Sequence, residues 1–413
     1  MRIQTPLQHY DLIVVGGGMV GASFAIALSQ VLRNQVLSIL VVEAAALIDD
    51  TSAQPSFDAR STALSYGSSR IFERMGLWPE MAKSLTAIHE IHVSDKGRFG
   101  SARLSRDEHG LDALGYVIEN RFLGRCLNKA LEASTTVQFL CPAAIFSIEP
   151  KPDGMSVVVR NESGSYSIGS SLVVLADGGK SPICDQLGIT RTVRHYQQQA
   201  LIANISFEKP HNHIAFERFT DTGPLAVLPL QSLHSLNRGS LVWTLSAGQS
   251  TDYMALSEAE LLTKLLERFG NRLGKIQKIG ERICYPLSLS VAKEQIRPGL
   301  VLLGNVAHTL HPVAGQGLNL ALRDAEVLAD TLGKAHRNGK LLGQLSVLQD
   351  YLTRQESDQD NAIRFTHYAT QLFSSNQSAS VWLRKFGLLS VDLFPMVRRE
   401  FAKQAMGLNS LQG

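Results

Sequence analysis

Two glycine-rich segments hold the residues of this chain best suited to chemistry. The first reads DLIVVGGGMVGASFAIAL over residues 11–28. It places Gly16, Gly18 and Gly21 in a G-x-G-x-x-G pattern between a strand-like run and a helix-like run. A tight turn, close backbone approach and free N–H groups at a helix start form a cradle for a pyrophosphate group. The first segment therefore predicts a dinucleotide site.

The second segment repeats the order of strand, glycine turn and helix start. It reads LLGNVAHTLHPVAGQGLNLALRDA over residues 302–325, and we expect its helix to begin about Gln316. Pro312 stiffens the turn, while Gly315 and Gly317 permit positive φ or bare backbone. The helix dipole favours negative charge in the turn, although an ordinary loop before a helix has the same pattern. Together the two segments indicate one long cofactor held at both ends.

An acidic residue strengthens the dinucleotide interpretation. The apolar run LSILVVE over residues 37–43 is typical of a parallel strand buried on both faces, and it ends in Glu43. Glu43 stands 25 positions after Gly18, near the offset expected for an acid that binds a ribose hydroxyl. The alternative is a solvated strand end. The strand, helix and acid together favour the ribose-binding role.

Composition excludes several functional classes. The chain has 413 residues, 44% hydrophobic and 19% charged, with a net charge of +3. This charge is too mild and dispersed to indicate nucleic-acid binding. Four scattered cysteines without a C-x-x-C pair are typical of reduced thiols in a cytoplasmic protein. No signal peptide and no apolar run long enough for a membrane span is evident.

Hydrophobic patterning predicts an α/β protein of interleaved parts. We expect a Rossmann-like domain interleaved with a mostly antiparallel sheet, followed by a helical C-terminus. Strand-like pieces between Pro and Gly breaks at residues 200–245 indicate the antiparallel sheet. The predicted division has three parts: a discontinuous nucleotide-binding domain at 1–75, 115–185 and 285–340, a substrate domain at 76–114 and 186–284, and a C-terminal helical region at 341–413.

Shorter motifs are more ambiguous. Asp177 begins the Asp-Gly pair of ADGGKSP after a core strand, where the bland interpretation is a turn. Arg60 in FDARSTAL follows the second strand and is equally typical of a surface arginine. His308 and His311 are spaced like metal ligands, but no acid or cysteine accompanies them at useful spacing, so we predict no metal site.

The C-terminal segment 381–403 combines basic and aromatic residues. Five Lys or Arg residues stand against two acids, with Trp382 and Phe386 among the apolar residues. An amphipathic helix of this kind can lie on a membrane surface. A packing helix with one solvated face is the alternative.

These motifs resemble one known family, the group A flavin-dependent aromatic hydroxylases, which includes para-hydroxybenzoate hydroxylase. VVGGGMVG is similar to the family's FAD-binding turn, ADGGKSP to its Asp-Gly motif, and GNVAHTLHPVAGQGLNLALRDA to its flavin-proximal motif. FDARSTAL, HVSDKGR and FERFTDTGPLAVLPL resemble the branch that hydroxylates 2-polyprenyl-6-methoxyphenol in ubiquinone biosynthesis. One departure is Asn305, which follows Gly304 where the wider family has Asp.

The resemblance implies roles for individual residues. Gly16, Gly18 and Gly21 would hold the pyrophosphate of FAD, and Glu43 its adenosine ribose. The remaining residues implied to contact the cofactor are Arg60, Arg125, Asp177, Asn305, Gly315, Gly317, Leu318 and Asn319. Pro312 and Gly315 would lie beside the flavin ring. Arg218 and Phe219 are candidates for the substrate wall, and the sequence assigns no acid–base residue.

The implied activity is hydroxylation of a polyprenylated phenol with O2, with NAD(P)H as a transient electron donor. The expected location is cytoplasmic or at the inner face of a membrane, in contact with other ubiquinone-biosynthesis proteins. Two alternatives remain within the resemblance: a hydroxylase for another ring position, and a catalytically silent flavoprotein scaffold, which Asn305 favours. A simple NAD-dependent dehydrogenase is a further alternative, and the second glycine turn argues against it.

Overall fold

The computed structural model describes residues 3, 5–33, 35–46, 60–96, 101–221, 223–311 and 315–374. Pro312 and the basic, aromatic segment 381–403 therefore lie outside the described residues.

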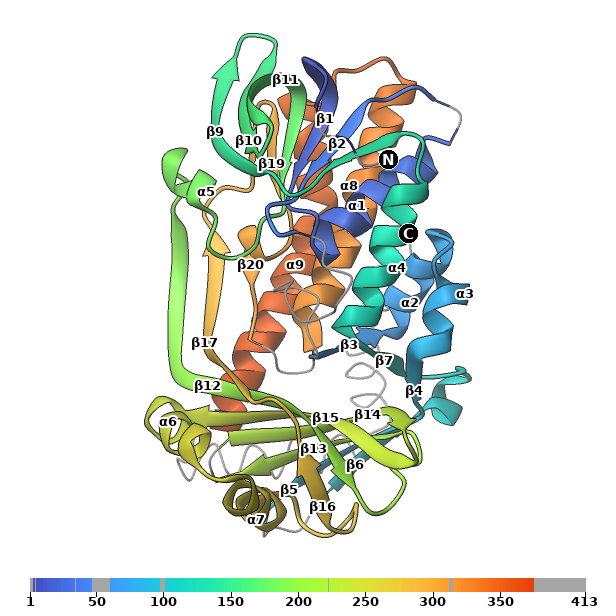
Figure 1. The fold of residues 1–413 in the computed structure, drawn as a ribbon, viewed down its shortest axis with the longest axis vertical. Coiled ribbons are helices and arrows are strands. Elements are labelled where there is room, and N and C mark those ends of the chain that lie inside the picture. Colours follow the sequence, from blue (N-terminus) through green and yellow to red (C-terminus); the bar gives the residue numbers. More distant parts are fainter. Residues whose placement is uncertain are drawn as a thin grey trace.

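A mainly parallel sheet forms the upper part of the molecule in Figure 1. Its central strands follow the order β18-β19-β11-β1-β2-β8, and β1 pairs in parallel with β11 and β2. β10 and β9 extend it as an antiparallel hairpin from β11. Its strands are β1 (His9–Val15), β2 (Ile39–Val42), β8 (Val137–Leu140), β9 (Ala144–Lys151), β10 (Gly154–Asn161), β11 (Gly164–Leu175), β18 (Ile296–Arg297) and β19 (Leu300–Leu302).

Helices cover one face of this sheet and bury its largest core. The core joins Phe24 and Leu28 of the first helix to Leu322 and Tyr351 of the last two, all fully or almost fully buried. These helices are α1 (Met19–Val31), α2 (Tyr66–Arg74), α3 (Trp78–Met81), α4 (Asn120–Ala133), α8 (Gln316–Arg337) and α9 (Leu345–Ser374). The short helix α5 (Pro182–Gln186) packs on the other face, in a second core that includes alternate residues of the same strands. The central strands are therefore apolar on both faces, as the near-continuous run in β2 predicts.

A second, mostly antiparallel sheet forms the lower part of the molecule (Figure 1). Its order is β20-β17-β12-β15-β14-β13-β5-β6, with β16 paired to β12. The strands are β5 (Glu90–Asp95), β6 (Ser101–Ser105), β12 (Arg191–Phe207), β13 (Ile214–Thr220), β14 (Gly223–Leu233), β15 (Leu236–Ser246), β16 (Ile276–Ile279), β17 (Ile283–Ala292) and β20 (His308–Thr309). Helices α6 (Ala247–Ala255) and α7 (Glu258–Phe269) lie beneath it.

The two sheets alternate along the chain, so the interleaved architecture predicted from the sequence is confirmed. Long strands β12 and β17 run from the upper sheet to the lower one (Figure 1). A small third sheet of β3 (Ser61–Ser65), β7 (Gly115–Glu119) and β4 (Leu85–Ile88) lies between them. The described part of the C-terminal region is helical, as predicted. The exact domain boundaries stay a prediction.

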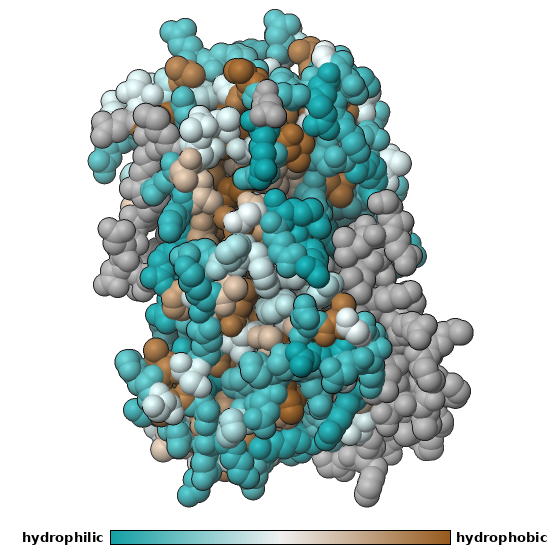
Figure 2. Space-filling view, turned by 90° about the vertical axis from the view of Figure 1, so that its right-hand side faces the viewer, coloured by the Kyte–Doolittle hydropathy of each residue, from teal (hydrophilic) through white to brown (hydrophobic). Residues whose placement is uncertain are grey.

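The surface gives no sign of a membrane-spanning element among the described residues. None of their helices combines the length and the apolar character that crossing a bilayer requires. On the face drawn in Figure 2, hydrophilic residues predominate and hydrophobic ones form small groups between them.

Candidate active site

The first glycine turn is packed tightly against the parallel sheet. Gly16 has a φ of +98°, and a Cβ atom there would lie 2.6 Å from the carbonyl oxygen of Ala176. A Cβ atom at Gly21 would lie only 1.9 Å from the Gly16 carbonyl oxygen. Helix α1 begins after Gly18 without a side-chain cap. The turn therefore presents the uncapped N-terminus of α1, where N–H groups can bind an anion.

Glu43 is fixed beside this turn by the backbone. Its Oε2 atom accepts a hydrogen bond from the Gly17 N–H at 2.7 Å, and its Oε1 atom accepts one from the Ala45 N–H at 2.8 Å. Each carboxylate oxygen retains capacity for a further hydrogen bond. The carboxylate is thus oriented at the end of β2, as binding of a ribose hydroxyl requires.

The second turn leads from β19 through η3 (Gly304–Val306) and β20 to the start of α8. Gly315 caps this helix in the left-handed conformation, with a φ of +62°. The helix begins at Gln316, as predicted. Pro312 falls in the segment that the structure does not describe, so its place beside the flavin stays a prediction.

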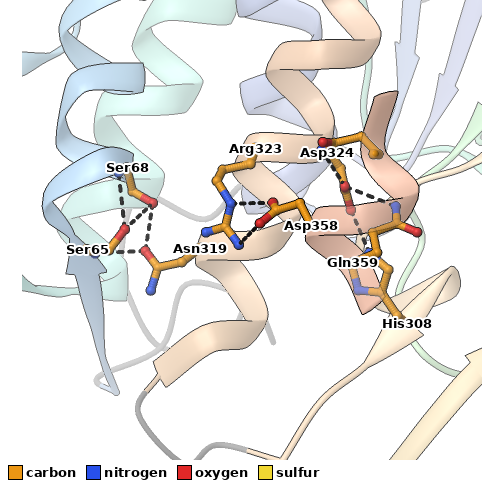
Figure 3. A network of polar contacts seen from close by, with 9 residues as sticks. Ser65, Ser68, His308, Asn319, Arg323, Asp324, Asp358 and Gln359 are labelled. Atoms are coloured by element: carbon orange, nitrogen blue, oxygen red, sulfur yellow. Dashed lines mark hydrogen bonds and ion pairs between the residues drawn. The ribbon is translucent and has the colours of Figure 1, made fainter. Parts of the chain in front are cut away.

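Asn319 ties the start of α8 to the third sheet. Its Nδ2 group donates to the carbonyl oxygens of Ala63 at 3.0 Å and Gly315 at 2.7 Å. Its Oδ1 atom accepts from the Ser65 N–H at 2.8 Å and the Ser68 hydroxyl at 2.7 Å (Figure 3). The amide thus uses both donor hydrogens and both acceptor lone pairs. The Asn319 side chain positions the turn, and its polar atoms have no capacity left for a ligand.

A cavity of about 710 Å³ connects the two turns. This volume lies within the range of small-molecule and cofactor sites. Seven predicted cofactor residues line it: Gly16, Gly18, Glu43, Arg60, Asp177, Asn305 and Leu318. Five others do not: Gly21, Arg125, Gly315, Gly317 and Asn319. The guanidinium of Arg125 instead lies 4.5 Å from the centre of the Phe122 ring on α4.

Asp177 supplies a polar group that fits a ligand in this cavity. Burial raises the pKa of its carboxyl group, while a hydrogen bond from Ser181 acts in the opposite direction. Its Oδ1 atom is buried and finds no hydrogen-bond partner among the described residues. An unsatisfied buried acceptor is costly unless a ligand or water binds it. The donor groups of a nucleotide cofactor would satisfy it.

The predicted substrate residues Arg218 and Phe219 lie on opposite faces of β13. Arg218 points toward α7, where its Nη1 atom donates to the Phe269 carbonyl oxygen at 2.6 Å. Phe219 is buried against Val93 and Ala102 on the other face. Arg218 therefore faces away from the upper sheet, because successive side chains alternate along a strand. Of this pair, only Phe219 remains a candidate for the substrate wall.

The two histidines of the second turn have structural partners. The Nε2 atom of buried His308 lies 2.5 Å from the Asp324 carboxylate, whose other oxygen accepts from Gln355 and Gln359 (Figure 3). Burial lowers the pKa of His311 to about 4. Within the described ranges, no three His, Cys, Asp or Glu side chains converge as metal ligands. His308 therefore links β20 to α8 and α9.

Sequence comparison identifies the family. Residues 9–351 match the family described as FAD binding domain. Ubiquinone hydroxylase UbiL of Rhodospirillum rubrum is 31% identical over 96% of this chain and 89% of that protein. The 3-demethoxyubiquinol 3-hydroxylase of Escherichia coli is 29% identical over 97% of this chain and 99% of that protein.

Comparison with solved structures finds the same fold in a known monooxygenase. The crystal structure of p-nitrophenol 4-monooxygenase PnpA from Pseudomonas putida has a TM-score of 0.79 and 18% identity, covering 98% of this chain and 99% of that one. This likeness shows the shared fold. The chain belongs to the FAD-binding family of flavin-dependent aromatic hydroxylases, and its sequence groups with the ubiquinone-biosynthesis members.

Proposed function

We propose that this enzyme hydroxylates the phenol ring of a polyprenylated ubiquinone precursor, 2-polyprenyl-6-methoxyphenol, using NAD(P)H and O2. The observation that carries the proposal is the cavity joining the two glycine turns, in a chain whose relatives are named for ubiquinone hydroxylation. The FDARSTAL and FERFTDTGPLAVLPL segments favour this precursor over other phenols.

The chain's residues would hold FAD along the cavity. The backbone of Gly16 and Gly18 would bind the pyrophosphate, and the oriented Glu43 carboxylate would accept from the adenosine ribose. Arg60 would offset phosphate charge, and Asn305 would contact the ribityl chain from η3. Each role follows from the group that the residue presents to the cavity.

When bound, FAD supplies the redox chemistry: it accepts a hydride from NAD(P)H and, with O2, delivers one oxygen atom to the ring while the other leaves as water. The protein positions and shields this chemistry. The N-terminus of α8, held by Asn319, favours negative charge beside the turn. The antiparallel sheet lies opposite the nucleotide-binding part (Figure 1), and we expect its side chains to limit the access of water to the ring.

Lipid analysis of a deletion strain tests the substrate. We expect 2-polyprenyl-6-methoxyphenol to accumulate, and a plasmid copy of the gene to abolish the accumulation. A second candidate is hydroxylation at another ring position, which the name of the Escherichia coli relative favours. Accumulation of a later, demethoxylated precursor would move the assignment to that position. Unchanged quinone precursors would contradict both.

The lipid nature of this substrate gives the C-terminal segment 381–403 a role. A polyprenylated phenol resides in the membrane, so the enzyme must reach a bilayer or a partner that carries the lipid. The basic and aromatic residues of the segment suit contact with an anionic bilayer surface or with other ubiquinone-biosynthesis proteins. Truncation after Gly387 should release the enzyme from the membrane fraction, and unchanged fractionation would refute this role.

A further inference from the structure

One row of residues crosses the middle of the antiparallel sheet on the side of the nucleotide cavity. Ile202 of β12 pairs with Val242 of β15, Val242 with Ala226 of β14, and Ala226 with Glu217 of β13. Directly paired residues project from the same face of a sheet. Because Ile202 lines the nucleotide cavity, Glu217 lies on the cavity-facing side of the sheet. With strands about 4.8 Å apart, Glu217 stands about 14 Å along the row from Ile202.

The alternate row confirms this orientation. Leu201, Trp243 and Leu225 are fully buried in the core that includes α7. Arg218, which pairs with Leu225, also points to α7. The members of the Glu217 row, in contrast, are all only partly buried although they lie in a central part of the sheet. This row therefore keeps some exposure on the side of the sheet that faces the nucleotide-binding part.

Glu217 is the acidic member of an otherwise apolar row. Its paired neighbours are Ala226 and Val93, and its carboxyl group has no hydrogen bond or ion pair with any described residue. Burial alone raises the pKa of Glu217 to about 7. Arg238, on the same face, pairs with Glu119 rather than with Glu217, and Glu119 also pairs with Arg121. A carboxyl group that its surroundings desolvate, and that no described residue pairs with, is costly to ionise, which points to a partner supplied by a ligand.

We propose that the Glu217 carboxylate binds the substrate's phenolic hydroxyl group and removes its proton as the ring is hydroxylated. This inference rests on the proposed phenol-hydroxylating function. The phenol O–H bond breaks, the proton moves to a carboxylate oxygen of Glu217, and the electron pair stays on the phenol oxygen. From there it raises the electron density of the ortho and para ring carbons, which receive the oxygen. The ring carbon that gains the oxygen atom loses its hydrogen as a proton, which leaves with the second oxygen atom as water, and the aromatic phenolate is restored. Glu217 then returns its own proton to the phenolate oxygen.

The first test compares Glu217→Gln with Glu90→Gln in the full-length, FAD-loaded enzyme. Glu90 lies on the adjacent strand β5 near Arg103, and its side chain alternates to the other face of the sheet. With 2-methoxy-6-geranylphenol as probe, Glu217→Gln should lower product formation by about 100-fold, the usual size of a general-base contribution. FAD content and Glu90→Gln activity should stay at wild-type levels. Product formation by Glu217→Gln within twofold of wild type would overturn the proposal.

The pH profile separates proton removal from simple packing. Wild-type hydroxylation should rise with pH through about 7 as Glu217 loses its proton. Glu217→Gln should lack this rise, because an amide cannot accept the proton. A rise of the same size and midpoint in Glu217→Gln would assign it to another group and overturn the proposal.

A binding experiment keeps the two proposals separable. The probe and its methyl ether are titrated against the flavin absorbance of the enzyme. Wild type should bind the phenol about tenfold more tightly than the ether, the value of one hydrogen bond to a charged acceptor. Glu217→Leu should bind both equally. If wild type binds the phenol selectively but does not hydroxylate it, the proposed function fails while the Glu217 contact stands. Equal binding of phenol and ether by wild type would overturn the contact.

Discussion

The two glycine-rich turns are similar in sequence but meet different surroundings. In the first turn, a Cβ atom at Gly21 would collide with the Gly16 carbonyl oxygen at 1.9 Å. In the second, a Cβ atom at Gly317 would meet nothing within 4 Å, although Gly315 is held in the left-handed conformation. The first turn needs its glycines for the packing of the protein on itself. Gly317 has no such need, so its small size points to something that approaches from outside.

This difference separates structural glycines from glycines that leave room for a ligand. The glycines of the G-x-G-x-x-G pattern allow α1 to pack closely on β1. The ligand contacts only the N-terminus of α1, which this packing leaves accessible. In the second turn, Gly317 leaves space beside the start of α8. Substitutions in the first turn should therefore mainly lower the free energy of unfolding, and substitutions at Gly317 should mainly weaken cofactor binding.

The largest effect is expected from Gly21→Ala. The added methyl group overlaps backbone that cannot move without separating α1 from β1. We expect the free energy of unfolding to fall by about 3 kcal/mol and the purified protein to lose its yellow flavin colour. Urea denaturation of the FAD-free protein measures the first effect, and absorbance of the purified protein the second. Wild-type stability in this variant would show that the first turn is not limited by its own packing.

A smaller loss of stability is expected from Asn319→Ala, which keeps the glycines of the second turn but removes the side chain that holds the turn in place. Groups on Ala63, Ser65, Ser68 and Gly315, those of the two serines buried, would each lose a hydrogen-bond partner. A cost of about 2–3 kcal/mol follows from leaving buried polar groups unsatisfied. Asn338→Ala, at the exposed opposite end of α8, serves as the control and should change stability little. Equal stabilities of the two variants would contradict the anchoring role.

Asn319 also shows what could and could not be predicted from the sequence. The strand–turn–helix order at both turns depends on local glycine and hydrophobic patterns, so the sequence predicts β1, α1, α4 and the start of α8 correctly. The hydrogen bonds of Asn319 join residues about 250 positions apart, and no local pattern reports them. The pairing of His308 with Asp324 also joins residues from different elements, so no local pattern predicts it.

The relative directions of the side chains on β13 could be predicted from the sequence alone. Arg218 and Phe219 are neighbours on a strand, so the two-residue period already prevents both from lining one wall. The same period places Glu217 and Phe219 on one face, in the run Phe-Glu-Arg-Phe. Which face meets the cavity depends on the covering helix α7, and only the fold supplies that information.

A modest, pH-dependent gain in the thermal stability of the FAD-free protein is expected from Asp177→Asn. Because burial raises the pKa of Asp177, the native protein holds this proton at pH values where the unfolded chain has lost it. The native state of the wild type is therefore progressively destabilised as pH rises through the unfolded and then the folded pKa. In FAD-free protein, Asp177→Asn should melt at a higher temperature than wild type at neutral pH, with the difference vanishing in acid. Asp185→Asn, exposed on α5, should show no such pH-dependent difference.

The smallest effect on the fold, and the sharpest test of the comparison, is expected from Gly317→Ala. The new methyl group meets open space and improves helix propensity, so the free energy of unfolding should stay level or rise by about 0.5 kcal/mol. If the flavin ring approaches this backbone, the same methyl group should weaken FAD binding by about tenfold, which corresponds to about 1.4 kcal/mol. Unfolding of FAD-free protein and titration with FAD measure the two quantities separately. A variant that binds FAD as wild type does would show that the space beside Gly317 belongs to something other than the cofactor, and the phenolic substrate would then be its next candidate occupant.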